Sequence, residues 1–150
     1  MVIKPKAVQH VGIPVSNIER SLAWYKEMLG LEPEFVMESS GEPLSTAVNV
    51  PNADLKFGFL RVGNTIVELL EYRSPRGRAQ DRRNNDVGAM HIAFEVDDIE
   101  DAYRKLRARG VKFNSPPVWI DHGDLAGCAF CYFTDPDNVQ LELFQVAGKK

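Results

Sequence analysis

The sequence has few of the features that mark secreted, membrane or nucleic-acid-binding proteins. It carries two cysteines in 150 residues, a net charge of −3 and no long apolar run. Two cysteines exclude a disulfide-rich scaffold, and a slightly acidic chain is a poor general nucleic-acid binder. No apolar run approaches the roughly 20 residues that span a bilayer, and the first residues lack the apolar core of a signal peptide. We therefore expect a cytoplasmic globular protein without nucleic-acid or membrane partners.

The two cysteines, Cys128 and Cys131, form a lone C-x-x-C in an apolar stretch that is typical of a strand. The motif alone also allows a redox pair or half of a zinc site. Residues three apart in a strand lie about 10 Å apart on opposite faces, whereas a disulfide needs Cα atoms within about 7 Å. No second C-x-x-C completes a zinc site. We predict two buried structural thiols.

Histidine is also scarce, with three in the chain, but two of them occur in matching contexts. His10 and His91 each open a short apolar segment, residues 10–15 and 91–96. Each segment is followed by a helical pattern and then by a strand pattern that carries Glu68 or Glu142. The histidines are 81 residues apart and the glutamates 74 residues apart. The chain therefore contains two copies of one supersecondary unit.

Both copies predict a helix followed by three strands. Residues 16–30 and 97–110 begin with Ser or Asp, suited to an N-cap, and end with Gly, suited to the left-handed position after a last turn. Strands are expected near residues 34–38, 55–62 and 65–71, and near residues 111–113, 126–134 and 139–145. Residues 39–54 are expected to form a loop over a site. The predicted fold is α+β, with βαβββ modules at residues 1–73 and 87–150, a linker at 74–86, and one structural domain overall.

Strand parity places the histidines and glutamates away from the apolar faces. His10 shares a face with Gly12, and Glu68 points away from Val67 and Leu69. A carboxylate among aliphatic residues is expensive to bury without a partner. The simpler alternative is a pair of solvated glutamates with two neutral, hydrogen-bonded histidines. Matching positions in both copies instead predict a divalent-metal site made of His10, Glu68, His91 and Glu142.

Two further features have no assigned role. The arginine-rich stretch from Arg73 to Arg83 could hold a phosphate or carboxylate of a substrate, although a solvated loop is the commoner explanation. His122 could act as an acid–base group, although an exposed loop histidine is the simpler expectation.

The motifs at residues 10–15, 67–71, 91–96 and 135–143 resemble the vicinal oxygen chelate superfamily. Its members include glyoxalase I, methylmalonyl-CoA epimerase, extradiol dioxygenases, and bleomycin- and fosfomycin-resistance proteins. The resemblance implies paired modules that form a U-shaped, partly open barrel-like sheet around a metal cleft. The stretch from Val67 to Tyr72 is more similar to the epimerase than to glyoxalase I. Asn138 and Val139 stand where the family usually has Gly-Asn.

Mixed nitrogen and oxygen donors suit one divalent transition ion, Zn, Ni, Co, Mn or Fe. Four protein ligands leave two open positions on an octahedral ion, enough for a chelating small-molecule substrate but not for a substrate plus O₂. We therefore expect an isomerase, epimerase or lyase that abstracts a proton next to a carbonyl through a metal-stabilised enolate, in a homodimer. The family's chemistry implies Glu142 as the base and Glu68 as the group that returns the proton. The alternatives are an Fe(II)-dependent extradiol-type dioxygenase or a non-catalytic antibiotic-binding protein.

Overall fold

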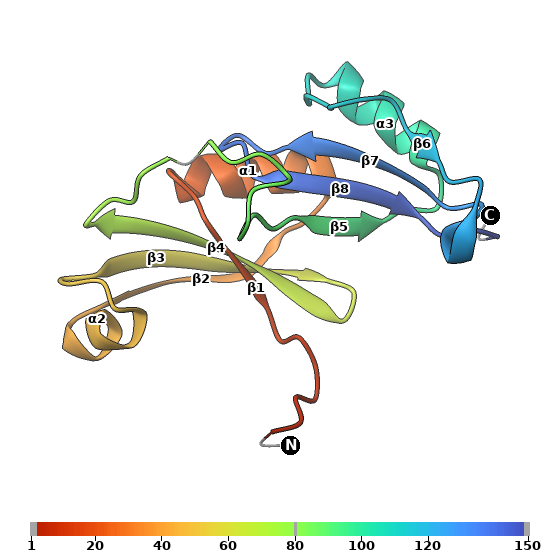
Figure 1. Cartoon of the computed structure of the whole chain (residues 1–150). Coiled ribbons are helices and arrows are strands. Elements are labelled where there is room, and N and C mark those ends of the chain that lie inside the picture. The colour runs from red at the N-terminus through yellow and green to blue at the C-terminus, as the bar shows by residue number, and fades with distance from the viewer. Residues whose placement is uncertain (1–2, 80, 149–150) are drawn as a thin grey trace. The chain divides into compact units, whose positions relative to one another are not determined.

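The computed structural model describes residues 3–79 and 81–148 and contains two four-stranded mixed sheets with helices beside them (Figure 1). The expected α+β class is confirmed. The chain divides into two compact units, Met1–Ala79 and Gln80–Lys150. Within the described residues, every helix is too short or too polar to cross a bilayer.

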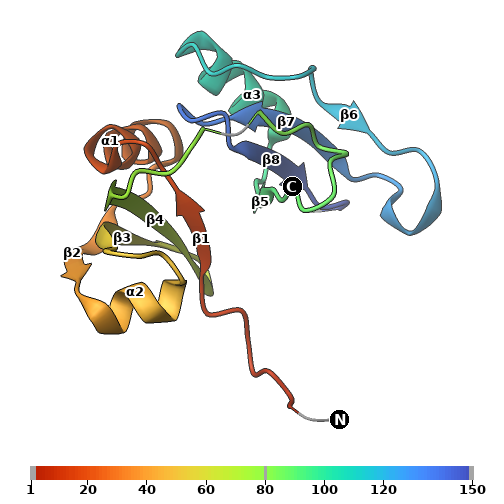
Figure 2. The same ribbon diagram turned by 60° about the vertical axis from the view of Figure 1, so that its left-hand side comes forward.

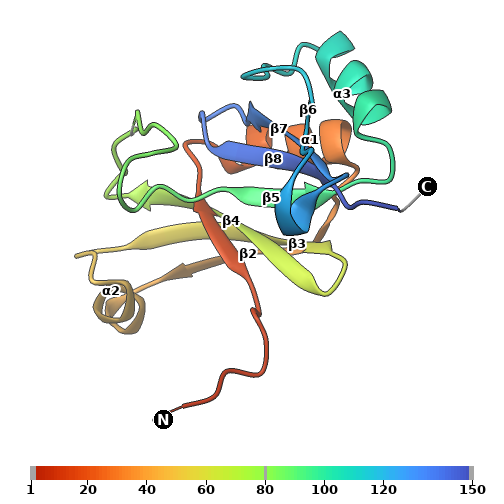
Figure 3. The same cartoon turned by 45° about the vertical axis from the view of Figure 1, so that its right-hand side comes forward.

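The first unit contains β1 (Val11–Pro14), α1 (Ile18–Leu29), β2 (Pro33–Ser40), α2 (Glu42–Val48), β3 (Asp54–Val62) and β4 (Thr65–Ser74). Its sheet has the order β1-β4-β3-β2, with β1 parallel to β4 and the other neighbours antiparallel. Helix α1 packs on β3 and β4 and buries Ile18 and Tyr25 completely. The helix predicted within residues 16–30 is thereby confirmed. Figure 3 shows the N-terminal segment leading away from β1.

The second unit contains β5 (Ile92–Glu95), α3 (Ile99–Ala108), β6 (Val118–Trp119), the 3₁₀ helix η1 (Gly123–Leu125), β7 (Ala129–Thr134) and β8 (Gln140–Gln145). The order is β5-β8-β7-β6, which repeats the topology of the first sheet, and β5 is parallel to β8. Helix α3 lies against β8 and buries Ile99 and Leu106 (Figure 2). In the turn before β8, Asn138 has a φ of 61°.

Three sequence-based expectations for strands and loops were wrong. Residues 39–54 do not form a plain loop, because β2 continues to Ser40 and α2 follows it. Pro43 fits the first turn of α2, where its missing N–H is not needed. The Ser45 hydroxyl accepts a hydrogen bond from Ala53 N at 3.0 Å and ties this short helix to the start of β3.

The strand expected at residues 111–113 is reduced to one bridge between Phe113 and Phe133. The ladder to β7 resumes at β6, after Pro116 and Pro117, which have no N–H to donate. The strand expected from residue 126 begins at Ala129. The cap of α1 was also misplaced by one residue, because Asn17 rather than Ser16 accepts from the backbone of the first turn.

Candidate metal centre

The first His–Glu pair lies at the parallel junction of β1 and β4. His10 directly precedes β1, and Gly12 is in register with Glu68 on β4. His10 Nε2 lies 3.3 Å from Glu68 Oε2, and the side chains of His10 and Glu68 are 43% and 13% exposed. A Cβ at Gly12 would lie 3.1 Å from a methyl carbon of Leu70 and 3.6 Å from Glu68 Oε2. Glycine at this position therefore avoids a close contact with Leu70, next to the Glu68 carboxylate.

Gln9 contacts the other ring nitrogen of His10. Its side-chain oxygen contacts His10 Nδ1. An amide oxygen only accepts hydrogen bonds, so this contact is compatible with the tautomer that carries its proton on Nδ1. Nε2, the atom facing Glu68, is then the one available to a proton or a metal ion. Gln9 was not among the residues predicted from the sequence.

The second His–Glu pair occupies the equivalent place at the junction of β5 and β8. His91 directly precedes β5, and Ala93 is in register with Glu142 on β8. His91 Nε2 lies 2.9 Å from Glu142 Oε2, and the Glu142 side chain is only 8% exposed. Each predicted pair is thus formed within its own half of the chain.

The neighbouring strand distinguishes the two pairs. Phe59 is the cross-strand neighbour of Glu68, whereas Tyr132 is the cross-strand neighbour of Glu142. The Tyr132 hydroxyl lies 3.5 Å from His91 Nε2, and the two rings meet edge-on at 5.1 Å. Burial and the charge of Glu142 raise the pKa of Tyr132. The sequence showed an aromatic residue in this strand, but only the strand register shows its contact with the pair.

The surroundings of both carboxylates suit a bound cation. Burial raises the pKa of Glu68, and the nearby His10 partly opposes that effect. Among the described residues, neither Glu68 nor Glu142 has a lysine or arginine ion-pair partner. Imidazole nitrogen and carboxylate oxygen are ordinary ligands of divalent transition ions. Within the described part of each half, no third Cys, Asp, Glu or His gathers with the pair, so each half offers two donors.

Glu71 belongs to the same strand as Glu68 but serves a different purpose. Three residues on, it points to the opposite face, where its Oε2 accepts a hydrogen bond from Ile18 N at 2.9 Å. The second half has Gln145 in this role, with Oε1 accepting from Ile99 N at 2.9 Å. Glu71 and Gln145 therefore hold the N-termini of α1 and α3 and lie outside the pairs.

The remaining polar candidates contribute little to either pair. Cys128 and Cys131 are buried free thiols, as predicted, and burial raises the pKa of Cys131 to about 12. The His122 side chain is 89% exposed, and its Nδ1 lies 2.6 Å from Oδ1 of the neighbouring Asp121. Arg73 pairs with Glu38 and Asp54.

The linker region is exposed and makes local contacts. Arg82 donates to Gly88 O at 3.0 Å, and the Asp86 carboxylate accepts from Arg83 N at 2.7 Å. Gln80 lies outside the described residues. These contacts support a solvated loop.

Comparison with known proteins gives a consistent result along nearly the whole chain. A family model described as Glyoxalase/Bleomycin resistance protein/Dioxygenase superfamily matches residues 7–143. The chain is 34% identical over 145 residues to a 2-epi-5-epi-valiolone epimerase of an Actinomyces species, a match covering 93% of this chain and 79% of the relative. It is 32% identical over 144 residues to the mitochondrial methylmalonyl-CoA epimerase of Homo sapiens, covering 92% and 73%.

Solved structures show the same fold. A glyoxalase family protein from Bacillus cereus superposes with a TM-score of 0.78 at 18% identity, covering 98% of both chains. The fosfomycin resistance protein from Listeria monocytogenes, complexed with Mn(II) and sulfate, gives a TM-score of 0.62 at 18% identity, covering 97% of this chain and 94% of the other. At such identities the similarity establishes the fold alone.

Proposed function

Because this chain belongs to the glyoxalase/bleomycin resistance protein/dioxygenase superfamily, we propose that it is a divalent-metal-dependent isomerase, epimerase or lyase. The reaction would remove and return a proton at the carbon next to a carbonyl of a small-molecule substrate. The observation that carries this proposal is the duplicated pair of a half-exposed imidazole and a carboxylate that is 13% exposed in the first half and 8% exposed in the second, at the same place in each sheet. Two relatives above 30% identity are named as epimerases, which supports the same class.

In this proposal His10, Glu68, His91 and Glu142 hold one ion, and residues 1–73 and 87–150 act as a single domain. The ion would be Zn, Ni, Co, Mn or Fe, in keeping with the nitrogen and oxygen donors. When bound, it would polarise the substrate carbonyl and offset the negative charge that develops as the neighbouring proton leaves. A homodimer in the cytoplasm is the form in which we expect the protein to act.

The chain's own residues would move the proton. We assign Glu142 as the base that takes the proton and Glu68 as the group that returns it. Gln9 would keep the His10 ring in the tautomer whose Nε2 faces Glu68, because its side-chain oxygen contacts Nδ1. The Tyr132 hydroxyl would orient the Glu142 carboxylate, because the two residues are cross-strand neighbours joined by a side-chain hydrogen bond.

Metal content tests the ligand assignment separately from the reaction. Protein purified without chelators or nickel resin should contain a divalent transition ion. His10→Ala and Glu142→Ala should each lower the metal content sharply while leaving the circular dichroism spectrum unchanged. His122→Ala is the matched control, because this histidine is exposed and lies in a loop. Unchanged metal in both pair variants would refute the site.

Hydrogen exchange tests the reaction. Incubation with the true substrate in D₂O should place deuterium on the carbon next to the carbonyl, without O₂ consumption. Suitable candidates are 2-methyl-branched acyl-CoA thioesters, 2-oxoaldehyde thiol adducts and cyclic hydroxyketones. Glu142→Gln should reduce exchange by about 10²–10⁴-fold, the usual contribution of a general base. Fe(II)-dependent O₂ consumption would instead establish a dioxygenase, and tight binding of an aromatic compound by metal-free protein without turnover would establish a sequestering protein.

A further inference from the structure

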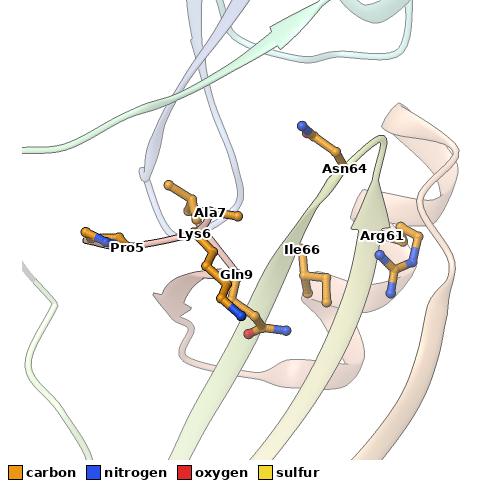
Figure 4. Close-up of a pocket in the computed structure, with 8 residues that line it drawn as sticks. Pro5, Lys6, Ala7, Gln9, Arg61, Asn64 and Ile66 are labelled. Atoms are coloured by element: carbon orange, nitrogen blue, oxygen red, sulfur yellow. The ribbon is translucent and has the colours of Figure 1, made fainter. Parts of the chain in front are cut away.

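An open pocket of about 420 Å³ is formed by the first half of the chain, and its lining includes Gln9, the neighbour of His10 in the sequence. It forms where the N-terminal segment runs past the β3–β4 hairpin. The lining residues are Pro5, Lys6, Ala7, Val8, Gln9, Arg61, Asn64 and Ile66. Figure 4 shows Lys6 and Gln9 extending from this segment toward Ile66, with Asn64 at the hairpin turn.

The walls of the pocket are fixed by contacts within the same half. The Thr65 hydroxyl donates to Val8 O at 3.1 Å, which fastens the N-terminal segment to the beginning of β4. Ile66, only 5% exposed, supplies apolar surface. The pocket therefore combines a secured backbone with apolar and polar surface, as small-molecule sites commonly do.

The charged residues that line the pocket are both cations. Lys6 and Arg61 are cations, Gln9 and Asn64 carry amide groups, and no carboxylate belongs to the lining. Arg61 already binds Glu34 through Nε and Nη2, at 2.5 and 3.1 Å. Lys6 has no ion-pair partner among the described residues. The Lys6 ammonium and the Gln9 amide extend from the same segment (Figure 4) and can donate the hydrogen bonds that a phosphate or carboxylate accepts.

Gln9 joins this pocket to the candidate metal ligand. It lines the pocket, and its side-chain oxygen contacts His10 Nδ1. Ile66 is two residues before Glu68 on the same strand, so the two side chains share a face of β4. A molecule occupying the pocket would thus extend along the sheet toward the His10–Glu68 pair.

We infer that this pocket binds an oxyanion group, a phosphate or a carboxylate, at the end of the substrate remote from the reacting carbon. Lys6 supplies the charge, and Gln9 supplies an amide hydrogen bond, while Asn64 borders the pocket at the hairpin turn. The inference rests on the proposed function only in attributing the anion to the substrate.

The test is an NMR titration of the full, metal-free chain with inorganic phosphate and, separately, with acetate at constant ionic strength. Saturable shifts are expected at the amides of Ala7, Gln9 and Asn64. Lys6→Ala should weaken the binding about tenfold, the loss expected for one charged hydrogen bond in a partly solvated site. Lys4→Ala is the matched control, because it removes the same charge from the same segment outside the pocket, and it should bind as the unchanged protein does.

Comparing phosphate with acetate shows which anionic group of the substrate the pocket binds. Saturation by phosphate alone would indicate a phosphate-bearing substrate, and saturation by acetate would indicate a carboxylate-bearing one. Shifts that do not saturate with either anion, or an equal loss of binding in Lys4→Ala and Lys6→Ala, would overturn the inference. The titration uses neither metal nor substrate, so its failure is distinct from a failure of the D₂O experiment, which would refute the proposed reaction while leaving anion binding intact.

Discussion

Glu68 and Glu71 offer a sharp test, because they lie on one strand and point to opposite faces. Glu68 approaches His10 at 3.3 Å, whereas Glu71 accepts a hydrogen bond from Ile18 N at 2.9 Å. Replacing either with Gln removes one carboxylate and keeps the shape of the side chain. We expect Glu68→Gln to lose metal and Glu71→Gln to keep it.

For the stability of the metal-free protein we expect the reverse order: Glu71→Gln should lower it, whereas Glu68→Gln should not. A hydrogen bond to a charged group contributes about 1.5–3 kcal/mol and a neutral one about 0.5–1.5 kcal/mol, so Glu71→Gln should cost about 1 kcal/mol. Such a loss lowers the Tm of a domain of this size by about 2–4 °C. Glu71→Ala should cost more, about 1–3 kcal/mol, because Ile18 N is left without a partner. Gln145, which already fills this role in the second half, shows that an amide can hold the helix.

The expected change in stability on replacing Glu68 follows from the raised pKa of its carboxyl group. A carboxyl whose pKa is higher in the folded protein contributes stability below its unfolded pKa and loses that contribution as the pH rises through the folded pKa. At neutral pH, metal-free Glu68→Gln should therefore be at least as stable as the unchanged protein. Urea denaturation gives both stabilities, and elemental analysis gives the metal content. Loss of metal in Glu71→Gln, with the fold intact, would refute the assignment of separate roles.

Three further predictions concern the surroundings of the pairs. Replacing Cys128 and Cys131 together with Ala should preserve metal content at a cost of about 1 kcal/mol or more, and loss of metal under reducing conditions would contradict this. Tyr132→Phe should lower the metal affinity about 10–100-fold by removing the hydrogen bond that orients the Glu142 carboxylate, as measured by competition with a chelator; an unchanged affinity would show that the hydroxyl has no such role. Because burial raises the pKa of Glu68, an acid titration should release metal at a higher pH than an ordinary carboxylate site would, and retention of metal below pH of about 4 would contradict that expectation.

The pairing of each histidine with its glutamate could be predicted because the pattern of a strand has a period of two. Burial of Ile13 and Leu69 fixes which face of β1 and β4 meets the helix, and the same alternation turns His10 and Glu68 to the other face. A shift of one residue would expose the entire apolar face, so the sequence specifies this register strongly. The geometry within each half followed from that constraint.

The elements that sequence reasoning missed depend on contacts between distant residues. Helix α2 has seven residues and no side-chain N-cap, and it is held by the hydrogen bond between Ser45 and Ala53. A helix that short has little stability of its own, so composition suggested a loop. The contacts of Gln9 and Tyr132 with the histidines are equally invisible to periodicity, because they depend on side-chain direction and on the register between β7 and β8.

Comparing equivalent positions in the two halves of the chain distinguishes residues with a structural role from residues with a chemical role. At the N-termini of the helices the two halves use different groups, Glu71 and Gln145, because a backbone N–H needs only an oxygen acceptor. At the strand junctions the two halves use the same groups, an imidazole and a buried carboxylate, although a hydrogen bond alone could be made by many other pairs. A buried carboxylate without a lysine or arginine partner is costly for folding in both halves, and that cost is offset when a cation binds. Keeping this costly arrangement twice, while the helix anchors differ, is what a metal-binding role requires and a purely structural role does not.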